Sequence, residues 1–172
     1  MTRRTPNSAP AGLSAQTRHR PDRIYDDERH DPYQTNGKHA GIVRCSDCGL
    51  VYETGRWHRG PAPEGAGTAR CPACRRIRDR LPAGELLLDG PFVAAHREEL
   101  LRIARNEAEH EEAEHPLHRI IEVEDRGDGV VITTTDIHLP QRIGEAVRRA
   151  CHGELQVRYG SDEYSVRVHW QR

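Results

Sequence analysis

Cys45-Ser46-Asp47-Cys48 and Cys71-Pro72-Ala73-Cys74 are two Cys-x-x-Cys pairs with 22 residues between them. Two residues between cysteines allow one tight turn to direct both sulfur atoms at a single ion, so two such turns supply four thiolates. The spacing predicts a tetrahedral site for Zn²⁺ whose ligands are Cys45, Cys48, Cys71 and Cys74. Two independent disulfides, a redox-active pair and an iron–sulfur cluster are the alternatives.

The predicted site indicates a structural and not a catalytic role for the metal. Four thiolates close the coordination shell of Zn²⁺ and leave no open position for a substrate. The fifth cysteine, Cys151, lies at the end of a predicted helix, where its neighbour His152 points away from it. No Gly-x-x-x-x-Gly-Lys-Ser/Thr loop is present. We therefore expect a protein that is not an enzyme, with a redox or zinc-dependent enzyme as the least favoured alternative.

The composition favours a small core in a reducing compartment. Of the 172 residues, 35% are hydrophobic and 31% are charged, so a metal ion would compensate for scarce apolar side chains. The five cysteines are an odd number, no secretory signal is recognisable, and no run of 18 apolar residues could span a membrane. These features predict a cytoplasmic location, where thiolates bind metal in preference to forming disulfides.

The chain is predicted to divide into three parts. Residues 1–24 are rich in Pro, Ser, Thr and Arg and indicate a disordered tail. Residues 25–90 form the zinc-binding module, onto which Tyr25 and Tyr33 are expected to dock. Within it we expect short strands at 42–44 and 50–52, a turn with an aromatic plug at 55–58, and a linker at 81–90.

Residues 91–172 are predicted to form a separate α+β domain. Helical periodicity marks residues 92–113 and 139–151, and β-branched or alternating segments mark strands at 117–124, 130–135, 154–159 and 164–170. The order is α-β-β-α-β-β. Its simplest arrangement is a two-layer domain, in which two helices cover one face of a four-stranded, largely antiparallel sheet. The acidic run from Glu107 to His115 is expected to be a solvated helix end.

Charge is unevenly distributed along the chain. The net charge is −1 overall, but residues 91–172 carry 11 basic and 16 acidic residues. Around the second cysteine pair, arginines dominate, and arginine suits bidentate contact with phosphate. An exposed Trp57 could stack on a base. The predicted RNA-binding residues are Arg56, Trp57, Arg70, Arg75, Arg76, Arg78 and Arg80. The alternative roles are neutralisation of the negatively charged zinc–thiolate centre by arginine and a core-filling role for Trp57.

A family resemblance supports this interpretation. Cys45-x-x-Cys48-Gly49, Tyr52, Gly55-Arg56-Trp57 and Cys71-x-x-Cys74, followed by a helix and a β-β-α-β-β tail, resemble a small bacterial zinc-ribbon family. Supporting stretches are 115–120, 139–144 and 164–168. That family is similar to the N-terminal part of the adaptor for large ribosomal subunit export that is named after nonsense-mediated decay. The resemblance covers roughly residues 25–172.

The resemblance implies zinc binding by the four cysteines and contact with the ribosome or a structured RNA. The adaptor has a richer cysteine region and further domains, and nuclear export does not apply to a bacterial relative. The leading prediction is a zinc-binding module that contacts ribosome or structured RNA. The alternative is a protein–protein adaptor without nucleic acid, with a protein partner on the acidic C-terminal half.

Overall fold

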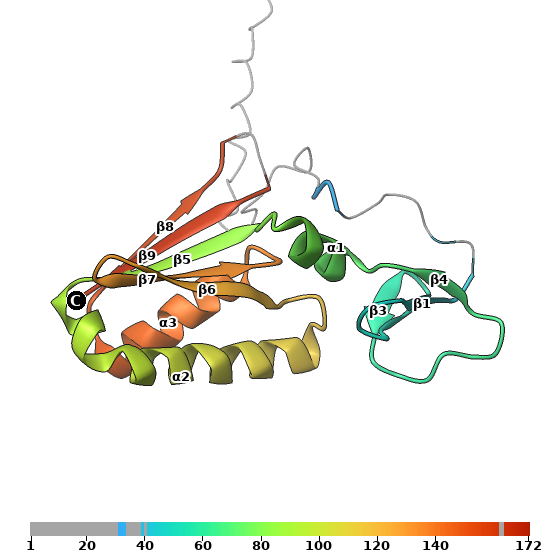
Figure 1. The fold of residues 1–172 in the computed structure, drawn as a ribbon, viewed down its shortest axis with the longest axis horizontal. Coiled ribbons are helices and arrows are strands. Elements are labelled where there is room, and N and C mark those ends of the chain that lie inside the picture. The colour runs from blue at the N-terminus through green and yellow to red at the C-terminus, as the bar shows by residue number, and fades with distance from the viewer. Residues whose placement is uncertain (1–30, 34–38, 40, 162–163) are drawn as a thin grey trace, which may run out of the picture.

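The computed structural model describes residues 31–33, 39, 41–161 and 164–172 and shows a small ribbon next to a larger two-layer domain (Figure 1). The predicted α+β class, with a zinc ribbon ahead of a two-layer domain, is confirmed. The expected tail at 1–24 and the expected anchor Tyr25 lie outside the described residues. None of the described helices combines the length and the apolar character that a bilayer crossing requires.

The ribbon is a four-stranded sheet followed by one helix. Its strands are β1 (Val43–Cys45), β2 (Val51–Glu53), β3 (Arg56–His58) and β4 (Gly67–Ala69), in the order β3-β2-β1-β4, and the helix is α1 (Pro72–Asp79). The predicted turn at 55–58 is wrong. Thr54 and Gly55 have φ values of 48° and 87°, and this tight left-handed turn allows the next three residues to pair with β2.

The larger domain alternates strands and helices. It contains β5 (Gly84–Asp89), α2 (Pro91–Glu114), β6 (Ile120–Arg126), β7 (Gly129–Thr134), α3 (Leu139–Cys151), β8 (Glu154–Tyr159) and β9 (Val166–Gln171). The sheet order is β6-β7-β5-β9-β8, in which β5 and β9 are parallel and the other neighbours antiparallel. Both long helices lie on the same side of this sheet, as expected (Figure 1).

The sheet differs from the prediction in its central strand. The segment 84–89, expected to be linker within the zinc module, forms β5 and pairs with β7 and β9, so the sheet has five strands and not four. The strand passes very close to the start of α3. A Cβ atom on Gly84 would lie 2.3 Å from Pro140 Cγ and 2.6 Å from the Asp136 carbonyl oxygen. Only glycine therefore fits at this point of the sheet.

The two parts bury very different cores. In the larger domain, aliphatic side chains from the sheet meet the inner faces of α2 and α3, with Leu86, Leu100, Ile143 and Trp170 fully buried. Cys151 is part of this core. In the ribbon, the buried cluster consists of Leu50, Ala73 and three of the cysteines, with Trp57 and Leu117 packed against it.

Contacts hold the ribbon against the larger domain and anchor the preceding segment. Leu117, from the loop between α2 and β6, packs on the cysteine cluster. Tyr33 lies on α1, where its hydroxyl donates to Asp79 Oδ2 at 3.1 Å and its ring lies under the Arg76 guanidinium at 4.5 Å. The predicted docking of Tyr33 on the zinc module is confirmed.

Candidate metal centre and the adjoining groove

The four predicted cysteines converge on one point. Their sulfur atoms all lie within 4.8 Å of one another, and Cys48 Sγ is 3.7 Å from Cys71 Sγ. A tetrahedron with Zn–S bonds of about 2.3 Å places its sulfur atoms roughly 3.8 Å apart. Among the described residues, no other group of histidine, cysteine or acidic side chains has a metal-binding arrangement. The four cysteines are thus a metal-binding cluster, and its closed thiolate donor set fits zinc.

Two turns of the chain position these sulfur atoms. Cys45 ends β1, and Gly49, with φ of 76°, closes the first turn by donating its N–H to the Cys45 carbonyl. Cys71 is the N-cap of α1, and its sulfur accepts from the Cys74 N–H at 3.4 Å. The Cys71 N–H in turn donates to Cys45 Sγ at 3.3 Å. Backbone amides thus stabilise negative charge on sulfur from both turns.

The electrostatics of the cysteine cluster favour a bound cation. Burial opposes ionisation of Cys45, but the N–H groups of Cys48 and Cys71 outweigh it and lower the pKa of the Cys45 thiol to about 6. Burial raises the pKa of Cys74 to about 12, and burial also raises the pKa of Cys71. Four thiolates this close together repel one another, and a positive ion between them would offset that repulsion. All five cysteines are free, which argues against the two-disulfide alternative.

Two arginines neutralise the surroundings of the cluster. Arg70 Nε pairs with the Asp47 carboxylate and so joins the two cysteine turns; this hydrogen bond lowers the pKa of Asp47. Arg119 comes from the larger domain, where its Nε donates to the Pro116 carbonyl at 2.8 Å. Its Nη1 lies 3.7 Å from Cys74 Sγ. The charge of the metal centre is therefore coupled to the larger domain.

A groove of about 880 Å³ opens beside the cluster, between the ribbon and the loop that follows α2. It brings together most of the predicted RNA-binding residues. The predicted residues that line it are Arg56, Trp57, Arg70, Arg75 and Arg78. Arg80, the C-cap of α1, is exposed outside this lining. The groove thus joins cationic side chains from β3, α1 and the segment between them.

Arg76 was predicted to bind RNA, but it does not line the groove. Its side chain is only 4% exposed, and its Nη2 pairs with Asp31 Oδ1 while its Nη1 donates to the Leu81 carbonyl at 3.0 Å. Because this guanidinium is buried and paired with a buried carboxylate, its donors are not accessible to a phosphate in solution. The role of Arg76 is to hold α1 against the segment around Asp31.

Aromatic rings form one wall of the groove. The rings of Tyr52 and Trp57 lie 5.4 Å apart and tilted, and His39 meets the edge of Tyr52 at 4.9 Å. Trp57 packs against the cysteine core and also lines the groove. The two roles considered for Trp57, filling of the core and presentation of an aromatic surface, are therefore compatible.

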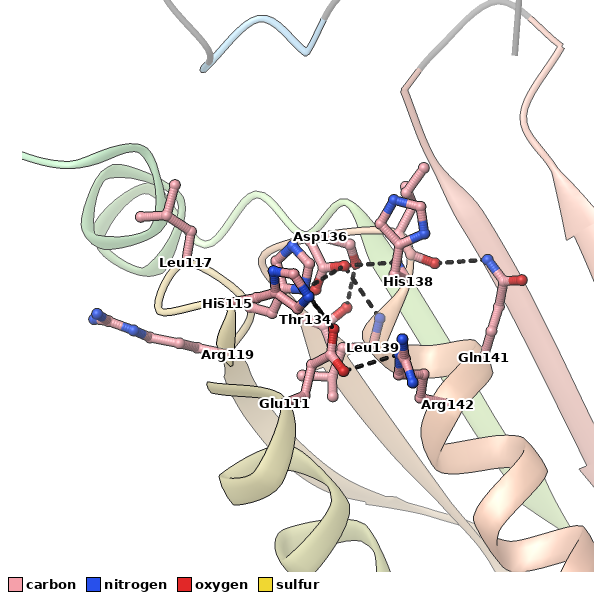
Figure 2. Close-up of polar contacts among 12 residues, drawn as sticks. Glu111, His115, Leu117, Arg119, Thr134, Asp136, His138, Leu139, Gln141 and Arg142 are labelled. Carbon is pink, nitrogen blue, oxygen red and sulfur yellow. Dashed lines mark hydrogen bonds and ion pairs between the residues drawn. The ribbon is translucent and has the colours of Figure 1, made fainter. Parts of the chain in front are cut away.

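The end of the groove contains a polar cluster that the sequence reasoning missed. His115 and His118 line the groove with stacked rings. Behind them Glu111 is only 2% exposed; its Oε1 is 3.0 Å from His118 Nδ1 and its Oε2 is 2.9 Å from Arg142 Nε. The expected solvated helix end is wrong at Glu111. Figure 2 shows this carboxylate turned toward Arg142.

Asp136 completes the cluster from the start of α3. Its Oδ2 accepts from the N–H groups of His138 at 2.6 Å and Leu139 at 3.1 Å, which caps the helix (Figure 2). The same oxygen lies 3.7 Å from His118 Nδ1. The Nδ1 atom of His118 therefore faces two buried carboxylates. The sequence signal was weak, because Glu111 is one of five acidic residues between positions 107 and 114 of α2 and only packing distinguishes it.

Comparison with known proteins identifies no relative from which the role of the site could be inferred. No family model matches the chain, and neither a curated protein nor a solved structure matches it. The relation to the small bacterial zinc-ribbon family stays a prediction that rests on the quoted cysteine and Gly-Arg-Trp motifs.

Proposed function

We propose that this protein is a non-catalytic, zinc-binding module of the cytoplasm that contacts the ribosome or a structured RNA through the groove beside its metal centre. The observation that carries the proposal is the convergence of four arginines and Trp57 on that one groove. Zinc has a structural role, because the four cysteines fill a tetrahedral shell.

The groove has the chemistry that an RNA strand requires. Arginine forks bind phosphate oxygens, and aromatic rings stack on unpaired bases. Among the described residues, Arg56 and Arg75 have no carboxylate partner, whereas Arg70 pairs with Asp47 and Arg78 with Asp79. Arg56 and Arg75 are therefore the side chains most available to phosphate.

The test is binding of the zinc-loaded full chain to purified ribosomes and to structured RNA at increasing salt. A triple variant, Arg56→Glu, Arg75→Glu and Arg78→Glu, reverses the charge of three of the four arginines that line the groove. The matched control reverses three exposed arginines elsewhere, Arg102, Arg105 and Arg126. Loss of three phosphate contacts lowers the slope of log affinity against log salt by about 2. The control variant is expected to keep the wild-type slope.

Two outcomes contradict the proposal. In the first, the protein fails to sediment with ribosomes at low salt and binds no RNA. In the second, groove and control variants lose the same amount of affinity, which indicates unspecific attraction. A partner that is captured equally well after nuclease treatment, with weak dependence on salt, would instead support the protein–protein adaptor.

A further inference from the structure

The five-stranded sheet has an exposed edge at β8. Among the described strands, β8 pairs only with β9, and most of its residues are exposed. Its residues on the helix side of the sheet, Leu155 and Val157, lie opposite Trp170 and Val168 of β9. Val157 remains 38% exposed. From Glu154 to Arg158 this edge combines apolar side chains with backbone groups that pair with no second strand among the described residues, and such an edge is a template for another strand.

Among the described residues, the charged side chains of β8 have no ion-pair partner. Glu154 and Arg158 point to the other side of the sheet from Leu155, and neither forms an ion pair among the described residues. Arg158 lies directly opposite Arg167 of β9. Two like charges in directly opposed positions destabilise a strand pair. A negative side chain on the open flank of Arg158 would relieve this repulsion.

We propose that β8 pairs with β8 of a second copy of this chain and forms a two-fold symmetric dimer with one continuous sheet. Antiparallel pairing centred on Gln156 places Glu154 opposite Arg158 of the second copy, and Arg158 opposite its Glu154. The same register places Leu155 opposite Val157 on the helix side, so the apolar face continues across the interface. Both sets of helices then lie on one side of a ten-stranded sheet.

The strand sequence selects this register. Shifting the centre to Leu155 or to Val157 places Glu154 opposite Gln156 or Gly160, and neither register forms a Glu–Arg pair. A centre between two residues would turn the apolar face of one copy toward the polar face of the other. Charge complementarity and the apolar pattern therefore agree on Gln156 as the symmetry centre.

The opposite edge of the sheet is protected against the same pairing. β6 carries exposed Glu122, Glu124 and Asp125, and its register shifts between Ile120 and Glu122. Self-pairing of β6 centred on Val123 would oppose Glu122 to Glu124, which is unfavourable. Acidic side chains and an irregular register are the usual means of blocking an edge strand. The difference between the two edges favours β8 over β6 as the site of self-association in this sheet.

Sedimentation equilibrium of the zinc-loaded full chain, up to about 200 µM, tests the proposal. We expect a dimer whose affinity falls at least about tenfold in Glu154→Arg and in Arg158→Glu, because each change creates two like-charge pairs. The two variants, mixed in equal amounts, should form a heterodimer, because every position again faces its opposite charge. Arg102→Glu on α2 is the control, and circular dichroism verifies that each variant is folded.

The result that overturns the proposal is a wild-type chain that stays monomeric over this concentration range. A dimer that is unaffected by both charge reversals overturns it as well, because its interface then lies elsewhere. So does a mixture of the two variants that associates no better than each variant alone.

Discussion

The ribbon and the larger domain differ in what stabilises their folds. The larger domain buries a continuous aliphatic layer between its sheet and two helices, including Leu86, Leu100 and Ile143. The ribbon buries only a few small apolar side chains, those of Val43, Leu50, Val51 and Ala73, together with three of its four cysteines. Apolar burial stabilises the first, whereas the second has too small a core to fold without another source of free energy. In the ribbon, three of the four candidate metal ligands, Cys45, Cys71 and Cys74, are also part of the core.

Removal of the metal is expected to have the largest effect, because it should unfold the ribbon and leave the larger domain folded. Structural zinc sites contribute about 10–16 kcal/mol of apparent binding free energy in isolated fingers, far more than the ribbon core alone supplies. We expect that Cys71→Ser or a chelator abolishes amide protection between residues 43 and 79, while β5 and β7 remain protected. Hydrogen exchange read by mass spectrometry measures both regions in one sample.

Cys151→Ser is the matched control, because Cys151 is buried in the larger domain and lies apart from the four ligands. It should leave the zinc content at one ion per chain. Unchanged protection of the ribbon after metal removal would show that the ribbon and the larger domain do not differ in the way described.

A core truncation in the larger domain should destabilise that domain and leave the metal site of the ribbon intact. Leu86→Ala empties a fully buried position in the central strand and should cost about 2–5 kcal/mol of unfolding free energy. The zinc content should not change. Denaturant titration and metal analysis provide the two readings. Leu81→Ala, at a position that is 53% exposed, should change stability by less than about 0.5 kcal/mol. A loss of zinc in Leu86→Ala would contradict independent stabilisation of the two parts.

A smaller effect is expected at the junction between the two parts. Arg119→Ala removes the guanidinium that reaches both Pro116 O and Cys74 Sγ, and should cost about 1–3 kcal/mol. Because the lost contact with Cys74 joins the ribbon to the larger domain, we expect the two parts to unfold at more widely separated denaturant concentrations. Arg105→Ala, on the exposed side of α2, is the control. Fully coincident unfolding of both parts in Arg119→Ala would show that Arg119 does not couple them.

Local sequence patterns were sufficient to predict much of the fold. Helical periodicity placed α3 at its observed bounds, 139–151, and alternation placed β8 at 154–159. β5 was not predicted, because its run Leu86-Leu87-Leu88 does not alternate between polar and apolar residues and because the segment follows Pro82. Its neighbours β7 and β9 are distant in sequence, so only their pairing identifies it as the central strand.

The site shows the same division between local and distant information. The cysteine ligands were predictable because each pair is brought together by one short turn. The burial of Arg76 was not, because its partner Asp31 lies 45 residues away. Glu111 is likewise distinguished from its acidic neighbours only by Arg142 and His118, which approach from other segments.

The central claim is that the groove beside the cysteine cluster contacts RNA. Its most direct test is photo-cross-linking of the zinc-loaded full chain to purified ribosomes. Mass spectrometry of the cross-linked peptides identifies the residues that touch RNA. The account predicts cross-links at Tyr52 and Trp57 and in the peptide that spans 70–78, and their loss in the Arg56, Arg75 and Arg78 triple variant. Cross-links confined to the larger domain, or none at all, would contradict it.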